Sequence, residues 1–163
     1  MDQNQQIITW LKDAHAFEQS LEIILQAQIA ESRDVPEMQQ RLQQHLEETR
    51  EHRRRVASAL GTLGESPSKI KTLAGGFMGM LEGLSTAVFQ DRAIKNVLAD
   101  YAMEHFEIAC YRSLRVAANE AGFTDIATMC EEILKEETAM AEWLEEQIPD
   151  ITRAHLQGQP AKL

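Results

Sequence analysis

Residues 97–111 read VLADYAMEHFEIACY, and this stretch decides the fold. Apolar and aromatic side chains recur there at intervals of three and four residues, as on the buried face of an α-helix. Glu104 interrupts this seam near its centre, and Glu107 flanks it. The pattern therefore predicts a long helix that packs in a bundle and carries carboxylates on its inward face. The seam residues are Val97, Tyr101, Ile108 and Tyr111.

Glycine and proline divide the rest of the chain into segments rich in good helix formers. Pro36 suits a first helical turn, whereas Gly64 and Gly122 suit helix ends. No segment shows the alternation that is typical of a strand. We therefore expect an all-α fold. Its main helices should span residues 4–31, 36–63, 87–121 and 124–147, with a shorter helix over 68–84 and a loosely held tail over 149–163.

The lengths of the connections predict how these helices are arranged. The first two main helices are joined by a few residues, and so are the last two, so each pair forms an antiparallel hairpin. The connection between the hairpins holds the short helix and is long enough to cross the whole bundle. A four-helix bundle with one long crossover is the ferritin-like arrangement. We expect residues 1–163 to form a single domain of this type.

Each main helix carries acidic residues at the middle of its apolar seam. Because antiparallel helices of similar length bring their midpoints to one height, these carboxylates should meet in one layer. Burying several carboxylates together costs roughly several kcal/mol for each uncompensated charge. The seams hold no lysine at the matching height, so a pair of metal ions is the simplest counter-charge. The acids are Glu18, Glu48, Glu104, Glu107 and Glu137.

Two histidines extend this set of candidate ligands. His45 and His52 lie one turn on either side of Glu48. Carboxylates with one or two imidazoles suit iron or manganese rather than a metal that prefers thiolates. We expect two such ions, bridged by Glu48 and Glu137, with the other three glutamates as further ligands. His52 could equally pair with Glu48 or Glu51 at the surface, so the choice between the two histidines stays open.

Short strings on three of the helices resemble the YciE/YciF-type ferritin-like family of bacterial stress-associated proteins. They are DAHAFE at 13–18, HLEET at 45–49 and EHFEIACY at 104–111. The likeness extends over residues 13–149 and includes AEWL at 141–144, which is nearer the YciE branch. It implies a bundle that is often dimeric, with a rubrerythrin-like dimetal site. We accordingly expect a homodimer that binds metal ions.

The resemblance also implies where the chain departs from its relatives. Rubrerythrin-type sites use a Glu-x-x-His pair on the second and fourth helices. Glu48 and Glu137 match the glutamates of these pairs, but Glu51 and Met140 occupy the histidine positions. The implied function is the handling of iron or peroxide during stress, and this departure leaves open whether the protein is an enzyme. The alternative is a non-catalytic structural or interaction protein with a degenerate or empty metal site.

Composition excludes other classes of function. The chain has 26 acidic and 16 basic residues and a net charge of −10, which disfavours nucleic-acid binding. No apolar stretch approaches the roughly 20 residues of a membrane-spanning helix, and no signal peptide opens the sequence. Cys110 and Cys130 lack the spacing of a zinc site or redox motif. We expect a cytoplasmic protein without a membrane partner.

Overall fold

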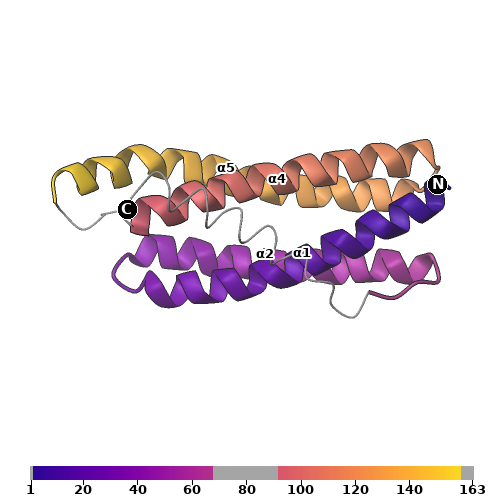
Figure 1. Cartoon of the computed structure of the whole chain (residues 1–163), viewed down its shortest axis with the longest axis horizontal. Coiled ribbons are helices and arrows are strands. Elements are labelled where there is room, and N and C mark those ends of the chain that lie inside the picture. The colour runs from indigo at the N-terminus through magenta and orange to yellow at the C-terminus, as the bar shows by residue number, and fades with distance from the viewer. Residues whose placement is uncertain (1, 68–91, 159–163) are drawn as a thin grey trace.

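The computed structural model describes residues 2–67 and 92–158, which form four α-helices in an elongated bundle (Figure 1). These residues contain no strand, so the all-α prediction is confirmed. The helix expected over residues 68–84 and the start expected at residue 87 lie outside the described residues. The helices are α1 (Gln3–Glu31), α2 (Pro36–Thr62), α4 (Arg92–Glu120) and α5 (Thr124–Leu156).

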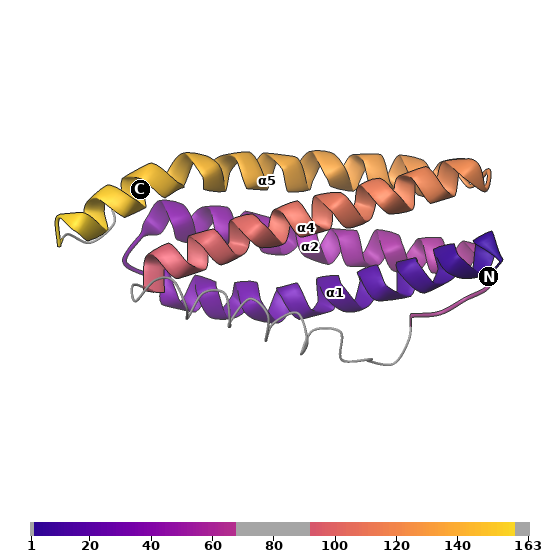
Figure 2. The ribbon, with the colours of Figure 1, turned by 45° about the horizontal axis from the view of Figure 1, so that its top comes forward.

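The helices form two hairpins that lie against each other. α1 packs mainly on α2 and α4 mainly on α5, while α1–α4 and α2–α5 contacts join the hairpins. Figure 2 shows that α1 and α5 run in one direction and that α2 and α4 run in the other. Each helix is therefore antiparallel to both of its neighbours. The end of α2 and the start of α4 lie at opposite ends of the bundle, as a long crossover requires (Figure 1).

Glycines with left-handed backbone end α2 and α4. Gly64 has φ of 73° and Gly122 has φ of 79°, a region that glycine adopts without steric cost. The amide after each glycine donates to the carbonyl five residues earlier, at 3.0 Å from Glu65 and 2.8 Å from Phe123. These bonds satisfy carbonyls that the helix end would leave unpaired. They explain why both helices end where the sequence predicts.

The predicted end of the last helix at residue 147 is wrong, because α5 continues through Pro149 to Leu156. Proline removes one backbone hydrogen bond, which leaves the carbonyl of Glu145 without its helical partner. Glu145 and Pro149 both lie on the exposed side, where water can satisfy that carbonyl. Ile151 is only 3% exposed and belongs to the same apolar cluster as Leu25 and Leu144, so its burial stabilises the extra turns. Figure 2 shows the bend near this end of α5.

Two apolar clusters fill the bundle towards its two ends. The polar residues of the seams lie between these two clusters, together with a small apolar cluster of Leu21 and Met103. One of the two large clusters includes Ile7, Leu11, Val56, Leu60 and Ile133. The other includes Leu25, Met38, Leu42, Val97 and Leu144.

In the described parts of the chain, no helix has the length and apolarity needed to cross a membrane.

We predict that Gly122→Ala lowers the free energy of unfolding by about 1 kcal/mol, because alanine is strained at positive φ. Gly61 provides the matched control, since it lies within α2 and a Cβ there would meet nothing within 4 Å. Gly61→Ala should instead raise stability by up to about 1 kcal/mol. Urea unfolding followed by circular dichroism measures both. Equal effects of the two substitutions would contradict the assigned role of Gly122.

Candidate metal centre

Four glutamates and two histidines meet in the middle of the bundle. Glu18 comes from α1, Glu104 and Glu107 from α4, and Glu137 from α5. Each of these glutamates is at most 3% exposed. His45 and His52 lie two turns apart on α2 and are equally buried, at 1% and 0% exposure. The expected carboxylate layer therefore exists, and both imidazoles belong to it.

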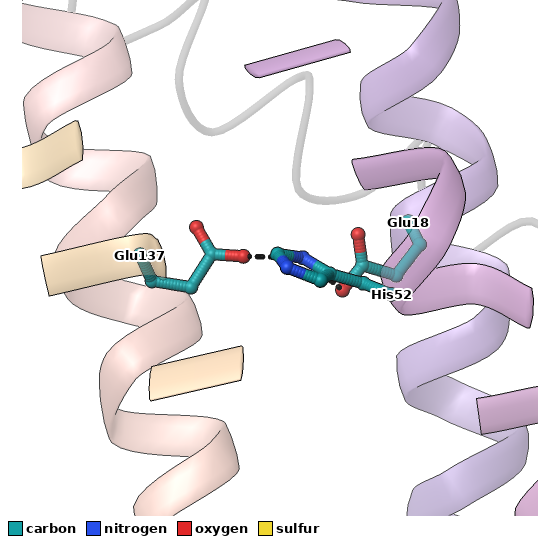
Figure 3. A group of neighbouring side chains, drawn as sticks. All are labelled: Glu18, His52 and Glu137. Carbon is teal, nitrogen blue, oxygen red and sulfur yellow. Dashed lines mark ion pairs between the residues drawn. The ribbon is translucent and has the colours of Figure 1, made fainter. Parts of the chain in front are cut away.

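Glu137 connects two groups of side chains, each able to hold a cation. In one group its Oε1 lies 2.8 Å from Nδ1 of His52, and that nitrogen lies 3.8 Å from Oε1 of Glu18 (Figure 3). In the other, Nε2 of His45 lies 3.1 Å from Oε1 of Glu104 and 3.9 Å from Oε2 of Glu137. The two oxygens of Glu137 thus face different histidines. Glu137 therefore belongs to both groups of potential ligands.

Most of the inward-facing oxygens lack a hydrogen-bond partner among the described residues. They are Oε2 of Glu18, Oε2 of Glu104, both oxygens of Glu107 and Oε2 of Glu137. Oε1 of Glu137 has only its ion pair with His52 in the part of the chain that the structure describes. Buried polar atoms are normally paired, because leaving one unpaired costs about 1–3 kcal/mol. A cluster of such atoms is what a cation would satisfy. The donor set of carboxylates and imidazoles fits iron or manganese.

Burial governs the protonation of the cluster in the absence of metal. It raises the pKa of Glu18 to about 7 and that of Glu104 to about 8, although nearby histidines oppose the shift. Burial and the carboxylates of Glu137, Glu18 and Glu104 raise the pKa of Glu107 well above its usual range. Burial also disfavours ionised Glu137, but His52 and His45 outweigh it and lower the pKa of that carboxyl. Glu137 therefore ionises at lower pH than the three glutamates around it.

Each histidine is held from its far side by a carboxylate that contacts an arginine. Nδ1 of His45 lies 3.1 Å from Glu48, which Arg41 contacts at 3.2 Å. Nε2 of His52 contacts Glu136, and Arg55 lies 3.5 Å from that glutamate. Burial alone would lower the pKa of both histidines. Their carboxylate partners outweigh it and raise the pKa of His52 to about 10 and that of His45 well above its usual range.

Glu48 does not join either group of potential ligands. Its carboxylate is 19% exposed and contacts Arg41 and His45, and Nε2 of Gln44 donates to it at 2.7 Å. Burial alone would raise the pKa of Glu48, but these contacts lower it to about 2. Glu48 therefore does not lie in the bridging position that we expect for it from the sequence. It instead orients His45.

His52 and Tyr111 complete the inner surface of the layer. His52 does not pair with Glu48 or Glu51 at the surface, because its ring is fully buried and faces α1 and α5. The Tyr111 hydroxyl donates to Oε1 of Glu18, which fixes this carboxylate from α4. Tyr111 is 3% exposed, so the contact is shielded from water.

Comparison with known proteins adds to this geometry. A family model described as "Domain of unknown function (DUF892)" matches residues 3–157. The chain belongs to the DUF892 family. A crystal structure of protein XCC3681 from Xanthomonas campestris is 35% identical, with a TM-score of 0.83, and the alignment covers 96% of this chain and 97% of that one.

More distant structures of known proteins share the DUF892 fold. The Escherichia coli stress protein YciF is 23% identical, with a TM-score of 0.78 and coverage of 94% of this chain and 98% of that one. Ferritin-like, diiron-carboxylate proteins from Bacillus anthracis are represented at 18% identity, with a TM-score of 0.73 and coverage of 91% and 99%. The fold is a ferritin-like four-helix bundle. The YciF-type resemblance inferred from the short strings is confirmed.

Sequence reasoning missed the residues that hold the histidines. Glu136 stands beside Glu137 in the sequence, but its contact with His52 depends on how α5 crosses α2. The apolar seams do not single out Arg41 and Arg55, which contact Glu48 and Glu136 in the structure. The signal that could have found Glu136 is the repetition of Glu47-Glu48-Thr49 as Glu136-Glu137-Thr138, which places two adjacent acids on each of these helices.

We predict that the metal-free protein loses stability as the pH rises from 5 to 8. Glu18, Glu104 and Glu107 have raised pKa values, so the folded state binds more protons than the unfolded state across this window. His52 acts in the same direction, because its stabilisation is complete below pH 6.5 and is lost towards about pH 10. Each proton that the folded state binds and the unfolded state does not lowers the free energy of unfolding by about 1.4 kcal/mol for each unit that the pH rises.

Bound ions should reverse this trend, because protons compete with a cation for the same oxygens. Urea unfolding at pH 5, 6, 7 and 8, with EDTA or with added Mn²⁺, measures both slopes. Glu48 and Glu137 have lowered pKa values, so their stabilisation is lost only as the pH falls below about 4.5, outside this window. Flat and parallel stability curves would contradict a shared buried layer of carboxylates.

Proposed function

We propose that the protein binds two iron or manganese ions in the middle of the bundle and uses them to handle iron or peroxide under stress. The observation that carries the proposal is the shared carboxylate of Glu137, which belongs to both groups of potential ligands. Glu18 and His52 complete one group, and His45 and Glu104 complete the other. Glu107 supplies two further buried oxygens beside them.

The residues around such a site would have different roles. Glu18, Glu104 and Glu137 balance the positive charge, and the two imidazoles add neutral donors. Tyr111 fixes Glu18, while Glu48 and Glu136 fix the rings of His45 and His52. A bound pair of iron or manganese ions would supply reversible one-electron chemistry. The apolar clusters at both ends keep bulk water away from this layer.

Two kinds of comparison support this function. The ferritin-like proteins from Bacillus anthracis are described as diiron-carboxylate proteins, and YciF is described as a stress protein. The donor set departs from the rubrerythrin pattern because α2 provides both imidazoles and α5 provides none. Each ion would nevertheless receive one imidazole, one carboxylate of its own and one oxygen of Glu137.

We predict that Glu137→Gln abolishes binding at both positions, because it removes the charge that the two groups share. Elemental analysis of protein purified without chelator, followed by Mn²⁺ titration of the metal-free form, measures the stoichiometry. The wild type should bind two ions per chain and the variant close to none. Glu142→Gln, an exposed change on the same helix, serves as the control and should leave binding unchanged. A wild type that binds no metal would favour the structural or interaction protein instead.

We also predict that Glu136→Gln weakens metal binding by about 10- to 100-fold without unfolding the bundle. The amide cannot hold the His52 ring as a carboxylate does. Glu132→Gln is the matched control, since Glu132 is 57% exposed and lies 4.0 Å from the same Arg55. Mn²⁺ affinity measured by electron paramagnetic resonance compares the two variants. Equal affinities would show that Glu136 does not position the ligand.

A further inference from the structure

A polar pair lies one helical turn from the candidate metal centre. Asp100 precedes Glu104 by one turn of α4 and is half-buried. Nε2 of Gln28, on α1, donates to Oδ1 of Asp100 at 2.7 Å. Gln28 is 9% exposed, and its Oε1 has no hydrogen-bond partner within residues 2–67 and 92–158. Leu21 and Leu25 line the same cavity as Asp100.

A small cavity lies between Asp100 and two residues of the metal centre, Glu104 and His45. Its volume is about 10 Å³, which is close to the minimum for a single water molecule. Asp100, Glu104 and His45 are its polar lining residues, and the other walls are apolar, including Ile24 and Met103. Asp100 and Ile24 are only partly buried, whereas Glu104 and His45 are almost completely buried. The cavity therefore extends from partly buried residues of α1 and α4 to the buried side chains of Glu104 and His45.

The lining of this cavity offers oxygen ligands to a cation. The carboxylate of Asp100 stands at one end and the carboxyl group of Glu104 at the other, and the lining residues include no lysine or arginine. The proton of His45 leaves when a cation binds, because the pKa of this imidazole is raised only while its carboxylate partners have no other cation. Oε2 of Glu104 is buried and unpartnered, so an arriving cation would find a free ligand atom at the inner end. Gln28 fixes the Asp100 carboxylate by donating a hydrogen bond to its Oδ1. Apolar walls around the carboxylate of Asp100 concentrate its field and attract positive charge.

We propose that this cavity is the route by which divalent cations reach the metal centre, and that Asp100 binds them transiently and passes them to Glu104 and His45. The inference rests on the proposed metal-binding function and adds a path and a transit residue to it. Asp100 belongs to neither group of potential ligands around Glu137. Its removal should therefore change how fast the centre fills rather than how much it holds.

The test measures the rate at which Co²⁺ fills the metal-free, full-length protein. Stopped-flow absorption follows the visible bands of bound Co²⁺, and elemental analysis gives the final amount. Asp100→Asn preserves size and can still accept the hydrogen bond from Gln28. It should slow loading by about tenfold and leave the final Co²⁺ per chain unchanged. Asp100→Glu, which keeps the charge, should restore much of the rate.

Salt dependence separates an electrostatic route from a merely structural role. Wild-type loading should slow as ionic strength rises, and loading of Asp100→Asn should depend less on salt. Asp125→Asn, at an exposed position on α5, controls for the loss of one negative charge. If Asp100→Asn fails to fold, Ile24→Trp narrows the cavity without changing charge and should also slow loading. Ile23→Trp, at a neighbouring position that is 68% exposed, is its control.

Several outcomes would overturn the inference. The first is that Asp100→Asn loads Co²⁺ as fast as the wild type. The second is that Asp125→Asn slows loading as much as Asp100→Asn does. The third is that Asp100→Asn binds less Co²⁺ than the wild type at equilibrium. Equal loading rates for Ile24→Trp and Ile23→Trp would also overturn the inference. A wild type that binds Co²⁺ while its variants load normally rejects the access route alone. A wild type that binds no Co²⁺ rejects the proposed function and the route together.

Discussion

The burial of several carboxylates in one layer is the constraint on which the rest of this structure depends. Glu18, Glu104, Glu107 and Glu137 cannot all be ionised in an apolar interior without a counter-charge. Two buried histidines offset part of the charge, and raised pKa values remove more of it. Oxygens that lack hydrogen-bond partners nevertheless remain in the layer. A bound cation would resolve this conflict without the protonation that the metal-free layer requires.

Asymmetry between the two hairpins decides which side chains serve the layer. The repeat between α2 and α5 suggests equivalent roles for Glu48 and Glu137, yet Glu137 faces both histidines whereas Glu48 faces Arg41. Both imidazoles come from α2, and their spacing of two turns places one beside each end of the Glu137 carboxylate. A single helix thus provides both imidazoles, which come from two helices in the rubrerythrin pattern. The departure from that pattern does not remove imidazole from either group.

The sequence predicts features that depend on one helix better than features that depend on how two helices cross. Apolar seams, Pro36 and the two helix-ending glycines are local signals, and they predict the helices and their order. The common height of Glu18, Glu104 and Glu137 follows from helix length and antiparallel packing. The contacts of Glu48 and Glu136 depend on the rotation of α2 and α5 about their axes, which seam patterns define only within a residue or two. Pro149 misleads because Ile151, two residues later, has a buried place to pack.

The apolar clusters on either side of the polar layer explain how such a site can be tolerated. Each cluster joins residues from all four described helices, so the bundle has two hydrophobic cores that need no metal. Burial of each large aliphatic side chain contributes about 1.5–3 kcal/mol, which can offset the unpaired oxygens between the clusters. The metal-free chain should therefore stay folded and keep its ligands in place. Because the ligands are held in place before a cation arrives, less ordering has to accompany binding, and the affinity for the cation rises.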